Sequence, residues 1–210
     1  MNITKLTETY IDSHPSVKDC VRKGLINYSA LTRKMSEDLG LDLKDNFDAI
    51  LIACRRYYSK IKKEAGLEDK IIGILKKSKL EVKNKIMVAV VEKSIFFNHL
   101  LELQKIVKVK SEVFHIIEGS STITLITSED FKEEIKKLFK NKLIRLSDSL
   151  AEITLKSSED MEQTPGVLAY LTSLLAENAI NIVETMSTWT DTLFVIEEND
   201  IARVMEVLKF

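Results

Sequence analysis

The chain has 210 residues, of which 45% are hydrophobic and 30% are charged, with a formal net charge of −1. This balance is typical of a globular protein of one or two domains and excludes fibrous classes. Two cysteines, Cys20 and Cys54, exclude a disulfide framework. The longest apolar runs, such as 86–91, are too short to span a bilayer, and the N-terminus has no signal-peptide pattern. We therefore expect a cytoplasmic protein without membrane contact.

The charge is distributed unevenly along the chain. Residues 1–80 carry 16 Lys and Arg against 11 Asp and Glu, a net of +5, whereas residues 81–210 carry 15 against 21, a net of −6. Opposite signs in the two halves indicate two modules with different partners. A basic module beside an acidic one is a pattern that favours nucleic acid as one of those partners.

The first half has helical spacing throughout. Pro15 opens a short helix that ends at Lys23, and Asn27 or Ser29 caps the next helix. After a turn that contains glycine, Asp45 is expected to cap a longer helix. Its apolar stripe consists of Phe47, Ile50, Leu51, Cys54, Tyr57, Tyr58 and Ile61. Two helices joined in this way have the layout of a helix-turn-helix.

The face of the long helix opposite this stripe is basic. The residues that we predict to contact nucleic acid are Arg55, Arg56, Ser59, Lys60 and Lys63. Such a patch neutralises phosphates and makes binding depend strongly on salt. An ordinary solvated face is the alternative, because Asp45 and Asp48 stand on the first turns, where a recognition helix meets the bases. Contact with a protein therefore competes with contact with DNA.

The second half repeats one pattern of strands and helices. After a connecting stretch, 69–84, we expect a strand at 86–91, a helix at 95–107, strands at 112–117 and 122–127, a helix at 128–139 capped by Ser128, and a strand at 143–146. The order then begins again with a strand at 150–156, a helix at 166–177 opened by Pro165 with Thr164 as its cap, strands at 181–186 and 193–196, and a helix at 199–208.

This repetition predicts an α+β fold. A helical module at 1–80 is followed by two ferredoxin-like (βαββαβ) units, at 81–148 and 149–210, and the second unit lacks its last strand because the chain stops at Phe210. The ferredoxin-like layout alone assigns no function.

Particular motifs in the last unit carry a resemblance to a family. They are the apolar first strand, Thr164-Pro165-Gly166-Val167 at the start of the helix, LLAENAINI running into the second strand, and the final strand FVI. With them, residues 149–210 resemble an ACT domain of the aspartate-kinase regulatory type. Residues 86–147 resemble a second, degraded ACT unit, in which Glu92-Lys93-Ser94-Ile95 replaces the Pro-Gly turn. With HPSVKDCVRKGLINYSALTRKM and AILIACRRYY, the whole chain resembles archaeal proteins that join a helix-turn-helix to paired ACT units.

The resemblance implies a small effector, usually an amino acid, bound at the loop after the first strand. The edge strands left by the truncated last unit predict a homodimer formed through the ACT units. The residues expected to contact the ligand are Met161, Gln163, Gly166, Val167, Leu168 and Asn181. Backbone N–H groups at the start of a helix favour a carboxylate, and an asparagine amide offers both a donor and an acceptor. The alternative is a tight turn at Pro165-Gly166 and an Asn181 that caps a strand.

Catalysis has little support in the sequence. The six glycines form no phosphate-binding array, and His14, His99 and His115 do not have metal-ligand spacing, so we expect no enzyme, no cofactor and no metal. Trp189 is expected to pack or to anchor an interface. The sequence thus predicts an amino-acid-responsive transcriptional regulator with DNA as a partner. The alternative is a regulatory subunit that docks on a metabolic enzyme without contacting DNA.

Overall fold

The computed structural model describes residues 2–62, 66–94, 97–110 and 112–210. The chain divides into two compact units, Met1–Lys70 and Ile71–Phe210, and this division lies upstream of the boundary expected at residue 80. In the described ranges, no helix has the length and apolar character that crossing a membrane requires.

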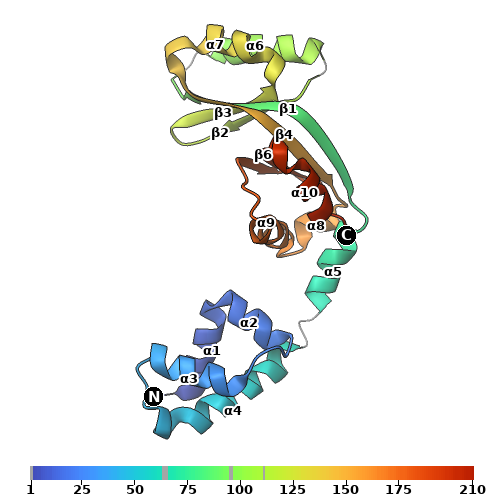
Figure 1. Ribbon diagram of the computed structural model, residues 1–210. Coiled ribbons are helices and arrows are strands. Elements are labelled where there is room, and N and C mark those ends of the chain that lie inside the picture. The colour runs from blue at the N-terminus through green and yellow to red at the C-terminus, as the bar shows by residue number, and fades with distance from the viewer. Residues whose placement is uncertain (1, 63–65, 95–96, 111) are drawn as a thin grey trace. The chain divides into compact units, whose positions relative to one another are not determined.

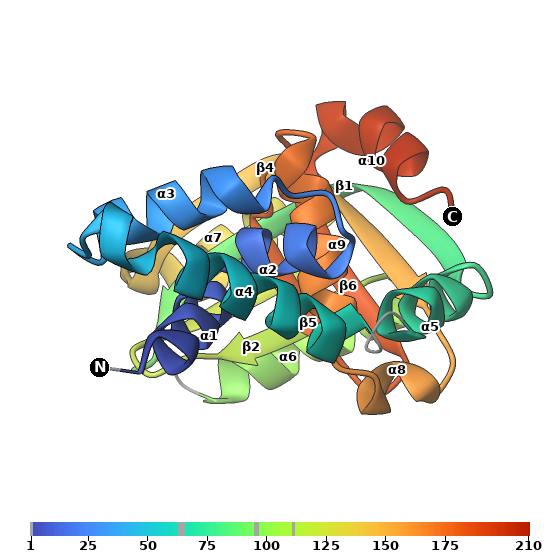
Figure 2. The ribbon, with the colours of Figure 1, turned by 90° about the horizontal axis from the view of Figure 1, so that it is seen from below.

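The N-terminal unit consists of helices around one small core. They are α1 (Ile3–Ser13), α2 (Pro15–Arg22), α3 (Tyr28–Asp38) and α4 (Leu43–Ile61). Helices α3 and α4 lie side by side (Figures 1 and 2), and α1 also packs on α4. The core includes Ile11, Met35, Ile50 and Cys54. Helix α1 was not expected, although Ile3, Tyr10 and Ile11 have helical spacing and lie in or against this core.

Side chains that precede each helix explain where the helices begin. Asn27 accepts a hydrogen bond from the N–H of Ala30, so Asn27 rather than Ser29 caps α3. Helix α4 is capped by Asp42, which accepts from the N–H groups of Lys44 and Asp45. The prediction that Asp45 caps α4 is wrong, because Asp45 already lies in the first turn.

The stretch expected to be a connection contains regular structure instead. Helix α5 (Gly66–Leu75) occupies its beginning, and strand β1 (Lys79–Glu92) starts within it. Ile71, Ile74 and Leu75, spaced for one helix face, are buried in the core of the C-terminal unit. Residues 79–83 alternate polar and apolar side chains, but the alternation is short and was not recognised as a strand.

The C-terminal unit is built on one six-stranded antiparallel sheet in the order β2-β3-β1-β4-β6-β5. The remaining strands are β2 (Phe114–Glu118), β3 (Thr122–Ser128), β4 (Leu143–Lys156), β5 (Glu184–Ser187) and β6 (Asp191–Glu197). Helices α6 (Phe97–Val109) and α7 (Lys132–Phe139) cover one end of the sheet. Helices α8 (Asp160–Gln163), α9 (Val167–Glu177) and α10 (Ile201–Val207) cover the other (Figure 1). Ser128 caps the short 3-10 helix Glu129–Phe131 that leads into α7, where the cap was expected.

Two long central strands are shared by both halves of this sheet. The strands expected at 143–146 and 150–156 form the single strand β4. The second half of β1 pairs with β3 and with the start of β4, whereas Lys79 to Lys83 pair with the end of β4. Each half therefore has four strands, in the order β2-β3-β1-β4 or β5-β6-β4-β1. Among the described residues, no strand follows α10 in the second unit, as expected, and the upstream segment 79–83 takes the position of its fourth strand.

Local backbone geometry lets each long strand serve both halves. The pairing register of β1 with β4 shifts between Lys83 and Ile86, where Lys85 has a φ of 54°. Ser149 on β4 has a φ of 58°. The face of the sheet away from the helices is also apolar in part, with Ile86, Val88 and Leu150 in one buried cluster.

Candidate functional site

A hollow of about 430 Å³ lies at the start of α9, beside the turn between β5 and β6. The residues that line it are Met161, Glu162, Thr164, Gly166, Val167, Leu168, Ala169, Ser187, Thr188 and Trp189. They come from α8, from the first turn of α9 and from the hairpin that joins the two strands. Segments well separated in the sequence therefore form one concave surface.

Gly166 determines how the chain enters α9. Its φ of 90° lies in the left-handed region, which a residue with a β-carbon adopts only with strain. No side chain caps α9, so the prediction that Thr164 is its cap is wrong. The Thr164 hydroxyl instead donates to the carbonyl of Asp160, at 2.7 Å, and closes α8. The first N–H groups of α9 have no acceptor within the helix, as at any helix N-terminus.

The lining of the hollow is chemically asymmetric. Glu162 is the only charged side chain among the lining residues, and no Lys or Arg is among them. Trp189 is 59% exposed and Leu168 is 44% exposed, so both present apolar surface to solvent. A helix N-terminus favours a negative group, whereas a carboxylate favours a cation. The hollow therefore offers both ends of an α-amino acid a complementary charge, beside an apolar wall.

The structure brings together four of the six residues expected to contact a ligand. Met161, Gly166, Val167 and Leu168 line the hollow, but Gln163 and Asn181 do not. Asn181 is exposed in the segment before β5, because that strand begins at Glu184, later than expected. Glu162, Thr164, Ala169, Ser187, Thr188 and Trp189 were missed. The one sequence feature that could have indicated that the hairpin lines the hollow is Trp189, a single tryptophan among polar residues.

Ion pairs surround residues 92–94 in the corresponding loop of the first half. The Lys142 ammonium lies 2.7 Å from a Glu92 carboxylate oxygen and 2.9 Å from the Ser94 hydroxyl. Lys93 pairs with Glu118 at 2.7 Å. Hydrogen bonding to Lys142 lowers the pKa of Glu92. Residue Ile95, expected in this loop, lies outside the described residues. Charges that a ligand would meet here are already compensated.

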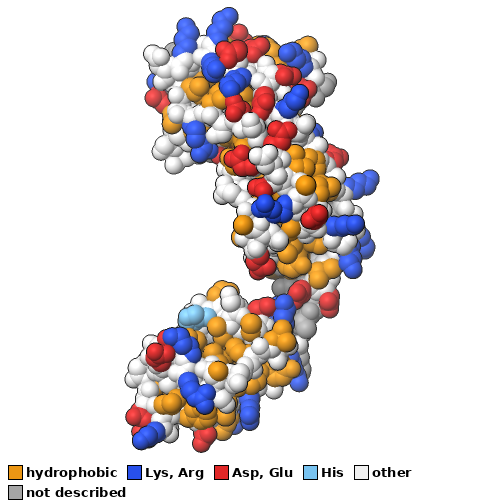
Figure 3. Space-filling model, viewed as in Figure 1, with side chains coloured by type: hydrophobic (Ala, Val, Ile, Leu, Met, Phe, Trp, Pro, Cys, Tyr) orange, Lys and Arg blue, Asp and Glu red, His pale blue; other side chains and the backbone are white. Residues whose placement is uncertain are grey.

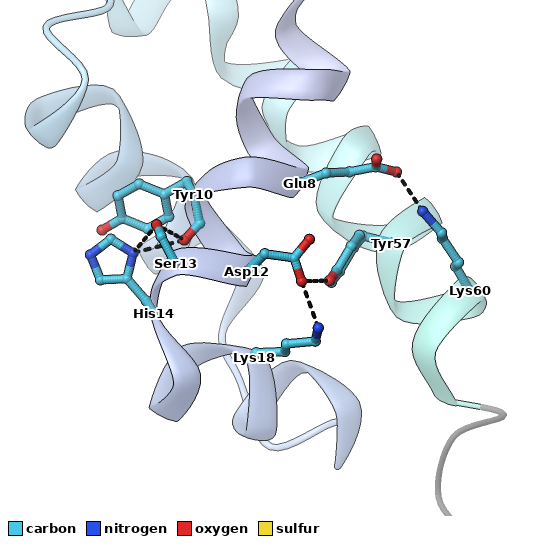
Figure 4. Close-up of polar contacts among 8 residues, drawn as sticks. All are labelled: Glu8, Tyr10, Asp12, Ser13, His14, Lys18, Tyr57 and Lys60. Atoms are coloured by element: carbon cyan, nitrogen blue, oxygen red, sulfur yellow. Dashed lines mark hydrogen bonds and ion pairs between the residues drawn. The ribbon is translucent and has the colours of Figure 1, made fainter. Parts of the chain in front are cut away.

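Four of the five residues expected to contact nucleic acid are exposed on α4, namely Arg55, Arg56, Ser59 and Lys60. Lys63 lies outside the described residues. Lys60 is 3.6 Å from a carboxylate oxygen of Glu8 on α1 (Figure 4), so its charge is partly engaged within the unit. Arg56 borders an open hollow of about 730 Å³. The other residues that line it are Asn2, Ile3, Thr4, Ala49, Ile52 and Ala53. This face is thus apolar as well as basic.

A polar cluster beside this face joins three helices (Figure 4). Asp12 of α1 accepts hydrogen bonds from the Tyr57 hydroxyl of α4, at 2.5 Å, and from the Lys18 ammonium of α2, at 2.6 Å. These bonds, with Lys18 contributing most, lower the pKa of Asp12. Burial, followed by the bond to Asp12, raises the pKa of Tyr57 and keeps its hydroxyl a donor. Asp12 thereby holds α1, α2 and α4 together.

The ranges that the structure describes contain no candidate metal site. No group of three or more His, Cys, Asp or Glu side chains there could hold an ion. His115 instead lies 3.0 Å from the buried carboxylate of Glu152, and His14 stacks on Tyr10 with ring centres 4.2 Å apart.

The strand order and the helices define two ferredoxin-like halves, of which the second carries the hollow. Residues 145–209 match the family model of the ACT domain. This match agrees with the resemblance of residues 149–210 to an ACT domain. A comparison with curated proteins finds no match.

Solved structures of aspartate kinases align with part of this chain. The Clostridium acetobutylicum enzyme aligns at 14% identity and a TM-score of 0.52, covering 62% of this chain and 33% of that one. The ligand-free regulatory subunit from Thermus thermophilus aligns at 12% identity and a TM-score of 0.49, covering 61% and 92%. A putative C-terminal regulatory domain of aspartate kinase from Porphyromonas gingivalis aligns at 12% identity and a TM-score of 0.47, covering 62% of this chain and 94% of that one. The chain thus spans about a third of the length of the Clostridium enzyme.

Proposed function

We propose that this chain is an amino-acid-responsive regulatory protein whose ACT domain binds an α-amino acid in the hollow at the start of α9. The observation that carries this function is the uncapped N-terminus of α9, opening into a concave surface that also contains a carboxylate. Regulation, rather than catalysis, is the role that a binding hollow without paired catalytic groups supports.

Each part of an amino acid has a partner in this hollow. The ligand carboxylate accepts hydrogen bonds from N–H groups at the start of α9, beginning at Val167. The ammonium group lies near Glu162, and the side chain lies against Trp189 and Leu168. Because no Lys or Arg lines the hollow, a ligand with a second carboxylate is disfavoured. Uncharged and aromatic amino acids are the expected ligands.

Helix α5 is the element through which occupancy acts on the rest of the chain. Ile71 is buried in the same core as Val167, the first residue of α9. The same helix begins at Gly66, upstream of the division between the units, and Glu68 in its first turn lies 3.4 Å from both Arg22 and Lys23. A ligand that fixes the start of α9 therefore restrains the part of α5 that shares this core. Allosteric couplings of this kind are typically about 1–3 kcal/mol.

The N-terminal unit is the output module in this scheme. Its first candidate partner is DNA, contacted through Arg55, Arg56, Ser59, Lys60 and Lys63, with two copies of the chain held together by their ACT units. The second candidate is an enzyme subunit, and the exposed apolar surface favours it, since Ile52 is 48% exposed. Replacing Arg56 by Glu abolishes DNA binding in the first case, whereas Ile52→Asp abolishes docking in the second. Light scattering at micromolar concentration tests the expected dimer.

A thermal-shift screen of the twenty amino acids on the full chain tests ligand binding. A ligand at 100 times its Kd stabilises the folded state by about 2.7 kcal/mol, a shift of several degrees. Trp189 is the single tryptophan, so its emission gives a second readout from the hollow itself. No shift and no change in emission with any amino acid would overturn the proposed function.

Matched variants locate the binding. Ala169 lines the hollow and is exposed, so Ala169→Phe fills the space without disturbing the core. Ala176 is exposed near the other end of the same helix, so Ala176→Phe is the control. We expect binding to be lost in the first variant and kept in the second. Equal behaviour of the two variants would place the ligand elsewhere.

A further inference from the structure

A strongly basic stretch of the chain lies outside the N-terminal unit. Residues 1–70 carry 13 Lys and Arg against 11 Asp and Glu, a net of only +2. The segment 76–85 contains five lysines and a single carboxylate, Glu81. These are Lys76, Lys77, Lys79, Lys83 and Lys85. The positive charge of the first half of the sequence is therefore concentrated where α5 ends and β1 begins.

These five lysines, which we call the β1 lysines, are exposed. Lys156 first, and then Lys83 and Lys79, lower the pKa of Glu81, so the charges of Lys79 and Lys83 are partly compensated. Not one of the five forms an ion pair with another described residue. Glu81, which lies among them, is instead bound by Lys156 at 2.8 Å. Lys and Arg side chains gather along the edge of the C-terminal unit near the start of β1 (Figure 3).

Some cations of the N-terminal unit are paired within the protein, whereas Arg55 and Arg56, like the β1 lysines, form no ion pair with a described residue. Lys18 is paired with Asp12 at 2.6 Å and Lys34 with Asp38 at 2.8 Å. Arg22 and Lys23 are engaged by Glu68. Unlike the β1 lysines, these side chains have anionic partners within the protein and so attract an external anion less strongly.

The shape of the segment suits an extended anion. Residues 79–83 pair with β4 alone, because β3 pairs with β1 only from Ile86 onward, so this part of β1 is an edge of the sheet. At about 3.3 Å per residue, Lys79 and Lys85 are separated by about 20 Å. A duplex carries one phosphate per about 1.7 Å of its axis, so it presents on the order of ten phosphates over that distance.

We propose that the β1 lysines bind the phosphate backbone of duplex DNA without reading its sequence. Lysine contacts phosphate as a point charge, whereas the cores of protein interfaces are depleted in lysine. A membrane surface is a poorer match, because the apolar side chains that insert into lipid are missing among these residues, except Val82, which is 37% exposed. This surface is separate from the amino-acid hollow and from the α4 face.

The individual contributions are graded along the segment. Glu112 and Asp130 line a hollow of about 320 Å³ together with Lys83 and Lys85. These carboxylates weaken the potential at the far end of the segment. Lys76, Lys77 and Lys79 have no such neighbours among the lining residues of that hollow. Glu81 acts on Lys79 and Lys83, so we expect Lys77→Gln to weaken DNA binding more than Lys85→Gln does.

The test is the salt dependence of binding of a short labelled DNA duplex to the full chain, followed by fluorescence anisotropy. Each phosphate contact contributes about 0.9 to the magnitude of the slope of log K against log salt. Replacing Lys76, Lys77, Lys79 and Lys83 together by Gln is therefore expected to reduce that magnitude by about 3–4. The control replaces Lys105 and Lys108, which are exposed on α6, and is expected to leave the slope unchanged. Circular dichroism verifies that each variant is folded.

Three results would overturn the proposal. One is the absence of binding at low salt. Another is binding that survives in the fourfold lysine variant but is lost when Arg55 and Arg56 are replaced by Gln, which places the contact on α4. The third is binding to vesicles of anionic lipid without binding to the duplex. Amino-acid binding by the hollow is unaffected in the lysine variant, so failure here is distinguishable from failure of the ligand site.

Discussion

The side chain of Ile71 lies against Gly166, with its Cδ1 atom 3.5 Å from the position that a β-carbon on Gly166 would occupy. Ile71 belongs to the helix that follows the N-terminal unit, and Gly166 forms the entry to the helix that opens into the hollow. The candidate ligand site and the connecting helix therefore share one packed contact. Any ligand that moves the backbone at Gly166 acts directly on α5.

Gly166 is expected to be intolerant of substitution. In Gly166→Ala the new β-carbon meets Ile71 at an ordinary contact distance, but the φ of 90° imposes strain of about 1–2 kcal/mol. Gly73 has an ordinary helical backbone in α5 and no atom within 4 Å of an added β-carbon, so Gly73→Ala is expected to stabilise by about 0.5–1 kcal/mol. Urea unfolding measures both. Destabilisation by both substitutions to the same extent would contradict the backbone argument.

The shared strands make the two halves of the sheet interdependent. A fragment of residues 71–210 is expected to fold cooperatively, because it contains both long strands and α5. A fragment of residues 145–210 lacks the strand at 79–83 and the buried side chains of Ile71, Ile74 and Leu75, so it is expected to be unfolded or to aggregate. Circular dichroism and thermal melts of the two fragments check this. A cooperative melt of the short fragment would show that the upstream strand is dispensable.

The two cysteines are expected to differ sharply in reactivity. Burial raises the pKa of the Cys54 thiol to about 11, whereas Cys20 is exposed on α2. Because the thiolate is the reactive form, a thiol reagent at neutral pH is expected to modify Cys20 quickly and Cys54 only on unfolding. Mass spectrometry of the native and denatured protein counts the modified sites. Rapid modification of Cys54 in the native protein would contradict the packing of α3 against α4.

The cluster at Asp12 predicts a pH dependence of stability. Because folding lowers the pKa of Asp12, its contribution is present above the unfolded value of about 3.9 and is lost as the pH falls through the folded value. Asp12→Asn is expected to cost about 0.5–1 kcal/mol at neutral pH, since the pair is partly exposed, and less in acid. Asp48→Asn, at an exposed site, is the control. A cost that stays constant between pH 7 and pH 3 would exclude the ionic origin.

The sequence was informative where side chains alternate or repeat without interruption. The buried strands of the second half and the stripe on α4 could be predicted because they are continuous apolar patterns. The strand at the start of β1 was missed because its alternation covers only residues 79–83 and its partner lies about 70 residues away. For the same reason, the sequence did not show that Trp189 and Gly166 line one hollow, because only the folded hairpin brings them together. Asn181 was misplaced because β5 is shorter than its apolar pattern suggests.

Amide hydrogen exchange of the full chain, with and without a pool of the twenty amino acids at millimolar concentration, tests the central claim most directly. We expect slower exchange at two separated segments, Gly166 to Ala169 and Ser187 to Trp189, because both line the hollow. Slower exchange in α5 would follow from the contact between Ile71 and Gly166. Unchanged exchange at both lining segments, or protection confined to the loop around Glu92, would contradict amino-acid binding at this site.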